Sequence, residues 1–274
     1  MNSTDEERLL KYVIFSQIKG VGPVTQNAIL DVCGDIKACF EVDGSRLMEH
    51  PGIEKVDRRR IETFLAMRHD EVLKSKAATI INNARRHRIE LITCDDPRYP
   101  KRFEGIYNRP LIIYAKGNLK INEYTRSVGI VGARRCSAEG KDRAVEITNA
   151  EVLKNAAIIS GMAKGIDSYA HTAVIRSKGY TFAVLAGGVD RCYPKEHQKL
   201  YEEIIRTGCV ISEYPPGTQP VRHMFPMRNR IIAALSDELY VVDTGRNSGT
   251  DSTVAFCEKY GRAVNDMSAC GICI

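Results

Sequence analysis

The chain has 274 residues, 43% of them hydrophobic, which is enough for one large α/β domain with a small companion. Its 40 basic and 34 acidic residues give a net charge of +6, and this balance favours a polyanionic partner only weakly. No stretch approaches the roughly 20 apolar residues that cross a bilayer, and the opening "MNSTDEERLL" is polar. We therefore expect a cytoplasmic protein with no membrane contact.

The nine cysteines are scattered through apolar and loop segments, and their number is odd. This pattern predicts reduced thiols rather than a disulfide framework. Cys270 and Cys273 have the spacing of half a zinc site, but no second half supplies the remaining two ligands. We expect neither a metal nor another cofactor.

Residues 1–90 predict a small helical domain, since their apolar residues recur at spacings of three to five without strand-like alternation. Within it, "IKGVGPVTQNAIL" and, more loosely, "HPGIEKVDRRRIETFL" place glycines between helical stretches, as in helix-hairpin-helix motifs. Glycines are equally what any tight connection between helices requires. The basic runs at 58–60 and 85–88 are consistent with phosphate contacts or with solvated helix faces. Contact of this domain with DNA stays open.

A linker is predicted at residues 91–110, where Pro97, Pro100 and Pro110 interrupt any helix. From residue 111 to residue 274, short β-rich runs ending in Gly, Pro or Ser alternate with segments of helical spacing. Near-continuous apolar strands separated by helices indicate an α/β domain, a mostly parallel sheet with helices on both faces. Right-handed crossovers would place the loops after the strands at one edge of this sheet.

Five strand-end loops are rich in Gly, Ser or Thr, and most of them carry Arg or Lys: "GARRCS", "SGMAKGID", "AGGVDRCYPKEH", "SEYPPGTQPVRHMFPMRNR" and "DTGRNSGTDST". Together at one edge they would form an electropositive cleft lined by backbone amides. Such a cleft is suited to phosphates.

The first of these loops does not fit a dinucleotide. Gly129 and Gly132 are three residues apart instead of two, and arginines follow where a dinucleotide fingerprint needs small residues. The fourth loop interleaves basic and aromatic residues, which suits phosphates and unpaired bases. These are Tyr214, Arg222, Phe225, Arg228 and Arg230. The pattern favours single-stranded nucleic acid over a bound cofactor.

Five ordered blocks resemble the DNA-processing protein A family, also called Smf: "GIVGARRCSAEG", "IISGMAKGIDSYAH", "FAVLAGGVDRCYPKEHQKL", "CVISEYPPGTQP" and "FPMRNRIIAALSD". The resemblance covers the α/β part to about Gly261, and the helical domain fits it. It implies an extended Rossmann-like fold without nucleotide-dependent catalysis. It further implies a homodimer that protects incoming single-stranded DNA and loads the recombinase RecA during natural transformation.

The resemblance also implies a basic DNA-binding pocket. Its residues match Arg134 in the first loop and Lys195 in the "YPK" turn, and the "FPMRNR" block adds Phe225, Arg228, Asn229 and Arg230. Arg134, Lys195 and Arg228 would engage phosphates, Gly132 would allow close backbone approach, and Phe225 would stack on a base. No residue is expected to be catalytic.

Structural roles are alternatives for several of these residues. Phe225 could pack in the core, and Arg230 could brace the fold through a carboxylate such as Asp243. His171 follows Asp167 at helical spacing, as in acid–base chemistry, but no motif places a nucleophile beside it. We expect a helix cap at Asp167 and a packed His171 instead. Glu213 stays ambiguous.

The C-terminal segment "GRNSGTDSTVAFCEKYGRAVNDMSACGICI" departs from the family pattern. It lacks the usual apolar pair after Ser-Gly, the closing Pro-Gly strand and the winged-helix domain of many members, and so predicts a shortened C-terminus. An inactive family remnant is therefore one alternative function. The other is a nucleoside-monophosphate phosphoribohydrolase, but the "PGGxGT" loop and catalytic glutamate of that related Rossmann group are missing from "AGGVD" and "NSGTD".

Overall fold

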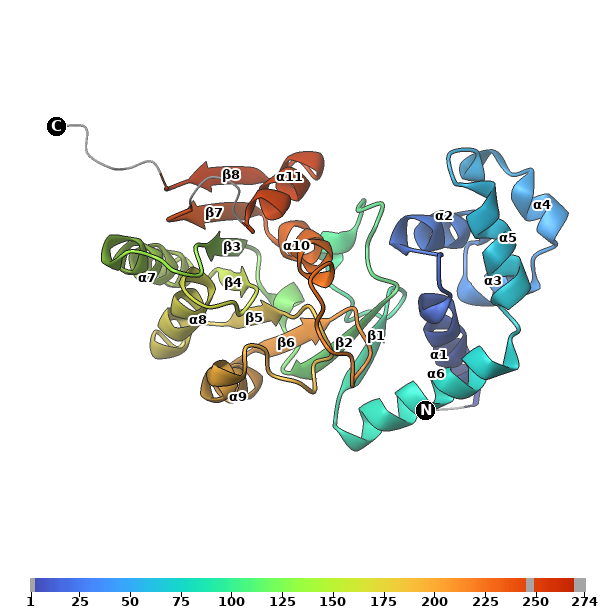
Figure 1. The fold of residues 1–274 in the computed structure, drawn as a ribbon, viewed down its shortest axis with the longest axis horizontal. Helices are drawn as coiled ribbons and strands as arrows, with labels where there is room; N and C mark the ends of the chain where they lie inside the picture. Colours follow the sequence, from blue (N-terminus) through green and yellow to red (C-terminus); the bar gives the residue numbers. More distant parts are fainter. Residues whose placement is uncertain (1–2, 245–248, 269–274) are drawn as a thin grey trace. The chain divides into compact units, whose positions relative to one another are not determined.

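The computed structural model describes residues 3–244 and 249–268, which fall into two compact units (Figure 1). The helical unit comprises Met1–Tyr99 and Gly105–Ile113, and the sheet unit comprises Pro100–Glu104 and Tyr114–Ile274. The segment predicted as a linker is thus shared between the two units. Within the described ranges, no helix has both the length and the apolar composition needed to cross a bilayer.

The helical unit confirms the predicted helical character of the N-terminal region. Its elements are α1 (Ser3–Gln17), α2 (Pro23–Cys33), α3 (Ile36–Glu41), α4 (Gly44–Met48), η1 (Pro51–Ile53), α5 (Arg58–Met67), α6 (Glu71–Arg86) and the short strand β1 (Glu90–Thr93). Aspartates at four N-caps accept from backbone N–H groups of α3, α4, α5 and α6 and so fix where these helices begin. Phe15 and Phe64, with ring centroids 4.5 Å apart, lie in the core.

The sheet unit contains a mostly parallel sheet, as predicted. Its strands follow the order β2-β6-β5-β4-β3-β7-β8, and β2 alone among these pairs antiparallel to its neighbour, β6. The strands are β2 (Ile112–Gly117), β3 (Ser127–Gly132), β4 (Ala157–Ser160), β5 (Thr181–Val184), β6 (Cys209–Ser212), β7 (Glu238–Val242) and β8 (Ala263–Asp266). β4, β5 and β6 are buried throughout, which explains their continuous apolar sequence.

Helices cover both faces of this sheet (Figure 1). α7, α8 and α9 follow β3, β4 and β5 and pack side by side on one face, while α10 and α11 lie against each other on the opposite face. The bounds are α7 (Ala138–Leu153), α8 (Ile166–Arg176), α9 (Gln198–Thr207), α10 (Met224–Leu235) and α11 (Asp251–Lys259), with one-turn helices η2 (Lys101–Phe103), η3 (Ile121–Glu123) and η4 (Lys195–His197).

The strand order reverses direction between β3 and β7. After β3 the chain crosses successively to β4, β5 and β6, and it then returns to the other side of β3 to form β7 and β8. The loops after β3 and β7 therefore lead to helices on opposite faces, which opens a crevice at the carboxyl ends of these two strands. Ligands of open α/β sheets bind at such points.

Candidate nucleic-acid interface

A cleft of about 840 Å³ lies at the carboxyl edge of the sheet, where the sequence predicted one. A smaller pocket of about 70 Å³ adjoins it and shares with it the side chains of Arg134, Tyr193, Phe225 and Arg228. The loops after β3, β4, β5 and β6 all contribute to the two linings, and Gly249 and Thr250 contribute from the segment that precedes α11. The predicted convergence of the strand-end loops is confirmed.

The rim of the cleft is formed by one arginine and two aromatic rings. The guanidinium carbon of exposed Arg134 lies 5.6 Å from the ring centroid of Phe225, in a cation–π contact. The ring of Tyr193, 49% exposed, lies 5.5 Å from that of Phe225 and is tilted by 52°. Phe225 is half-buried beside the cleft, so the alternative that it packs in the core is wrong. The rim therefore joins a cation to flat apolar surface open to solvent.

The floor of the cleft is formed by Arg228, which projects from the first turns of α10 and is 5% exposed. One of its terminal nitrogens donates to Gly161 O at 2.7 Å and to Val184 O, and its Nε donates to Asn229 Oδ1 at 3.0 Å. Burial lowers the pKa of Arg228 to about 10, so the side chain stays cationic near neutral pH. Arg228 thus ties the ends of β4 and β5 together and adds positive charge beneath the cleft.

Asp167 balances part of this charge. It is the second residue of α8, and its carboxylate accepts from Gly161 N at 3.1 Å and from Ala163 N at 3.2 Å. Burial raises the pKa of Asp167, while the neighbouring Arg228 opposes that rise. Asp167 therefore shapes the loop after β4, and the expectation that it caps a helix is wrong, because Gly165 is the N-cap of α8.

Asn229 and Arg230 direct their polar atoms to protein groups. Asn229 Nδ2 donates to Ser252 Oγ at 2.9 Å and to Gly249 O at 3.1 Å, which fixes the start of α11 beside the cleft. Arg230 is 1% exposed and forms an ion pair with Glu213. The carboxylate suggested for it, Asp243, instead accepts from Ser137 N at 2.5 Å. Glu213 thereby acquires a structural role that its sequence context left ambiguous.

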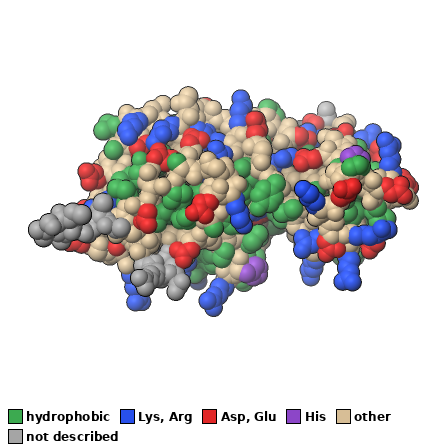
Figure 2. Space-filling model, turned by 90° about the horizontal axis from the view of Figure 1, so that it is seen from above, with side chains coloured by type: hydrophobic (Ala, Val, Ile, Leu, Met, Phe, Trp, Pro, Cys, Tyr) green, Lys and Arg blue, Asp and Glu red, His purple; other side chains and the backbone are tan. Residues whose placement is uncertain are grey.

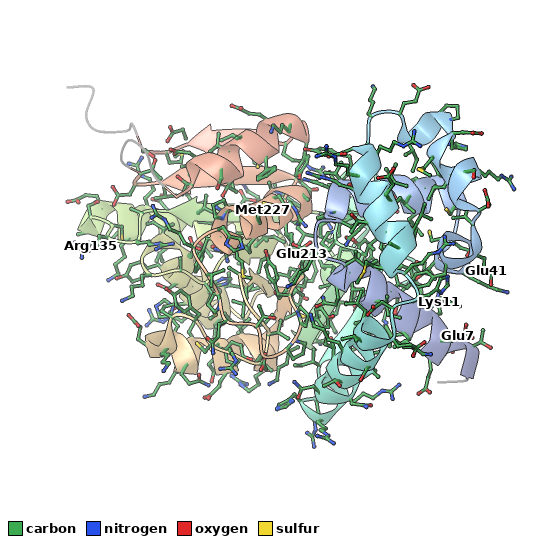
Figure 3. All side chains as sticks on the ribbon, turned by 45° about the vertical axis from the view of Figure 1, so that its right-hand side comes forward. Glu7, Lys11, Glu41, Arg135, Glu213 and Met227 are labelled. Atoms are coloured by element: carbon green, nitrogen blue, oxygen red, sulfur yellow. The ribbon has the colours of Figure 1, made fainter. Side chains whose placement is uncertain are left out.

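Gly132 and Lys195 occupy different places relative to the cleft. Gly132 lines it, but a Cβ there would lie 2.0 Å from Val242 O and 2.6 Å from Ile166, so the close approach that requires glycine is between protein segments. Lys195 is exposed in η4, directly after Pro194 of the smaller pocket, and lines neither cavity. Arg135 likewise lines neither cavity, and it extends away from the region of Glu213 and Met227 (Figure 3).

Several cleft residues were not singled out from the sequence. These are Lys164, Arg191 and Tyr193 in the smaller pocket. An exposed tyrosine within the Gly-rich, basic stretch "AGGVDRCYPKEH" was the available signal for Tyr193. Of the aromatic residues noted in the fourth loop, Tyr214 lines neither cavity, and burial raises its pKa to about 12. Only Phe225 of that loop supplies the cleft with an aromatic ring.

His171 is a packed residue, as expected. It is fully buried, and its Nδ1 lies 2.6 Å from Thr181 Oγ1. Burial lowers the pKa of His171 to about 3, and electrostatic interactions with His197 and Arg228 act in the same direction. The imidazole is therefore neutral over the physiological range.

Basic and acidic side chains are interspersed over the face of the molecule seen in Figure 2. The positive character of the cleft therefore depends on local side chains more than on the net charge. Among residues 3–244 and 249–268, no cluster of three or more His, Cys, Asp or Glu is arranged to hold a metal ion. Cys270 and Cys273 lie outside those ranges.

The fold and cleft define a doubly wound α/β protein whose strand-end loops are suited to a phosphate-bearing ligand. A family model described as DNA recombination-mediator protein A matches residues 90–269. The chain belongs to this DNA-processing protein A family.

Relatives and solved structures agree with this assignment. The DNA processing protein DprA of Bacillus subtilis is 33% identical over 82% of this chain and 76% of its own length, and a putative DprA of Mycobacterium tuberculosis is 34% identical over 88% and 62%. The crystal structure of DprA from Streptococcus pneumoniae superposes with a TM-score of 0.75 at 28% identity, covering 93% of this chain and 86% of that one. A structure of DprA from Helicobacter pylori, reported for its single-stranded DNA binding mode, superposes with a TM-score of 0.60 at 26% identity. The match covers 66% of this chain and 81% of that one.

Proposed function

We propose that this protein binds single-stranded DNA in the cleft at the carboxyl edge of its sheet. The observation that carries the proposal is the rim, where exposed Arg134 lies over the half-buried ring of Phe225 above cationic Arg228. An arginine can pair with a backbone phosphate while an adjacent ring stacks on an unpaired base. Duplex DNA has no free base faces for such stacking. The description of the H. pylori relative supports the same ligand.

The proposed role is that of a DNA-processing protein without catalysis of its own. Family membership supports protection of incoming DNA, delivery to RecA, a homodimeric state and a cytoplasmic location as parts of this proposal. The phosphoribohydrolase alternative is not favoured, since the loops lack its characteristic "PGGxGT" sequence and the relatives are DNA-processing proteins.

Fluorescence anisotropy with labelled oligo-dT, at low and at near-physiological salt, tests the proposal. Arg134→Ala is expected to lower the affinity for oligo-dT about tenfold. It is also expected to reduce the slope of log affinity against log salt by the amount that corresponds to about one phosphate contact. Lys195 lies outside the cleft, so the affinity of Lys195→Ala for oligo-dT shows whether a residue outside the cleft contributes to binding. Lys101→Ala and Lys116→Ala remove charges that line neither cavity and are the matched controls.

Equal affinity of the wild-type protein for duplex and oligo-dT would contradict the single-strand proposal. Release of free adenine from AMP would support the enzyme alternative instead. Light scattering with and without oligonucleotide tests the homodimer, and RecA filament formation on protein-coated oligonucleotide tests delivery.

A further inference from the structure

A basic groove, separate from the cleft, lies on the helical face formed by α7, α8 and α9. It encloses about 600 Å³, and its lining includes Lys141 of α7, Tyr169 and Arg176 of α8, and His197 and Lys199 at the start of α9. α8 lies between α7 and α9 (Figure 1), so residues one turn apart along it run the length of the groove. The proposed function does not account for this groove.

The charges of the groove are available for a ligand. Lys141, Arg176 and Lys199 are exposed, and no ion pair to a described carboxylate involves any of the three. The one acidic residue in the lining, Glu196, is already paired with Lys164. The backbone N–H groups at the start of α9 add further positive potential. The groove therefore carries a net positive charge of its own.

Tyr169 gives the groove a flat surface beside these charges. Its ring is partly exposed, and Lys141 Nζ lies 5.3 Å from the ring centroid in a cation–π contact. The same pairing of a cation with an aromatic ring forms the rim of the cleft, where Arg134 lies over Phe225. One chemistry, suited to a phosphate next to an unpaired base, thus occurs at both places.

The groove adjoins the cleft, because two contacts join residues of the one to residues of the other. Lys164 lines the smaller pocket of the cleft, and its ammonium group pairs with Glu196 of the groove. His197 of the groove contacts Met162 O at 3.1 Å, within the loop after β4 that also shapes the cleft. A strand leaving the cleft past Lys164 would therefore enter the groove directly.

We propose that the groove between α7, α8 and α9 binds a further segment of the same DNA strand, with Lys141, Arg176 and Lys199 contacting phosphates and Tyr169 stacking on a base. This inference rests on the proposed function of the cleft. It predicts a binding site longer than the cleft alone. A short oligonucleotide would occupy the cleft only, and a long one would occupy both the cleft and the groove.

The test compares an oligo-dT of about 6 nucleotides with one of about 20, lengths that bracket common single-strand site sizes. A Lys141→Gln, Arg176→Gln, Lys199→Gln variant is expected to bind the short oligonucleotide as the wild type does and to lose about tenfold or more in affinity for the long one. Three lost phosphate contacts on single-stranded DNA would reduce the slope of log affinity against log salt by about 2. Tyr169→Ala is expected to weaken long-oligonucleotide binding about tenfold, and Tyr169→Phe is expected to restore it.

The matched control is Lys101→Gln, Lys116→Gln, Lys259→Gln, which removes the same charge from residues outside both cavities and the groove. The groove proposal would be overturned if the groove variant lost no more affinity than this control, or if it lost equal affinity for both oligonucleotides. If the proposed function itself fails, the wild type binds neither length and Arg134→Ala changes nothing. If the groove proposal alone fails, Arg134→Ala still weakens both lengths while the groove variant matches its control.

Discussion

The rim and the floor of the cleft both carry arginines, but these arginines differ in their surroundings. At the rim, Arg134 is exposed, and its described ring contact is with a half-buried phenylalanine. At the floor and behind it, Arg228 and Arg230 are 5% and 1% exposed, and their nitrogens donate to carbonyl oxygens or to a carboxylate. An exposed cation can exchange water for phosphate, whereas a buried and bonded cation would have to break protein contacts first. Arginines around one cleft can therefore serve stability or binding according to their depth.

The largest expected effect is on stability, at Arg230. Arg230→Leu leaves Glu213 as a largely buried carboxylate without its partner, so we expect a loss of about 3–5 kcal/mol in the free energy of unfolding, measured by urea denaturation. Adding Glu213→Leu to this variant is expected to recover much of the loss, because the uncompensated charge is then gone. The control Arg206→Leu removes an exposed ion pair and is expected to cost less than about 1 kcal/mol. A similar cost for Arg230→Leu and Arg206→Leu would refute the structural role.

A smaller loss is expected at Arg228. Arg228→Met leaves Gly161 O and Val184 O without this donor and Asp167 without its nearby cation. We expect a loss of about 2–3 kcal/mol in the free energy of unfolding, in the range of hydrogen bonds to charged groups. Arg228→Lys keeps the charge but not the planar fork, and it is expected to restore only part of the stability. Full restoration by lysine would show that charge alone matters at the floor.

The buried side chain of His171 predicts that stability depends on pH. The folded-state pKa of His171 is about 3, below its ordinary value of 6.5, so the unfolded chain binds a proton at this site before the folded one does. Stability is therefore expected to fall as pH decreases from about 6.5 towards 3, with a loss on the order of 2 kcal/mol between pH 7.5 and pH 5. His171→Gln should flatten this part of the profile in urea titrations at several pH values. An unchanged slope in His171→Gln, or an equal flattening by His223→Gln at an exposed position, would contradict this origin.

The sequence predicted the sheet and the location of the cleft, because both follow from local patterns. Near-continuous apolar runs separated by helical segments predict parallel strands, and right-handed crossovers place the following loops at one edge. It could not predict the antiparallel pairing of β2 with β6, because the direction of an edge strand depends on a long-range contact. The short strand β1 lies at the start of the segment predicted as a linker, since "ELIT" is too brief to stand out beside the prolines that follow.

Within the cleft, the sequence identified the types of residue but not how deeply each side chain is buried. "FPMRNR" places Phe225, Arg228 and Arg230 in one candidate block, but successive residues of a helix point in different directions. The first turns of α10 therefore place Phe225 at the rim and Arg228 at the floor, and direct Arg230 to Glu213. The partner of Arg230 depends on the loop after β6 and on no local pattern, which is why Asp243 was a reasonable but wrong suggestion.

The smallest expected effect is on binding, at Phe225. Phe225→Ala removes the ring beneath Arg134 and the stacking surface that it offers, so we expect affinity for oligo-dT to fall about tenfold, near 1.4 kcal/mol, in fluorescence anisotropy. Phe225→Trp keeps an aromatic face and is expected to bind about as well as the wild type. Because Phe225 is only half-buried, the alanine variant should lose less stability than Arg230→Leu does. Phe225→Ala could instead unfold at a much lower urea concentration while its folded fraction kept wild-type affinity. In that case the rim would serve stability, as the floor does, and the proposed difference in role between rim and floor would be wrong.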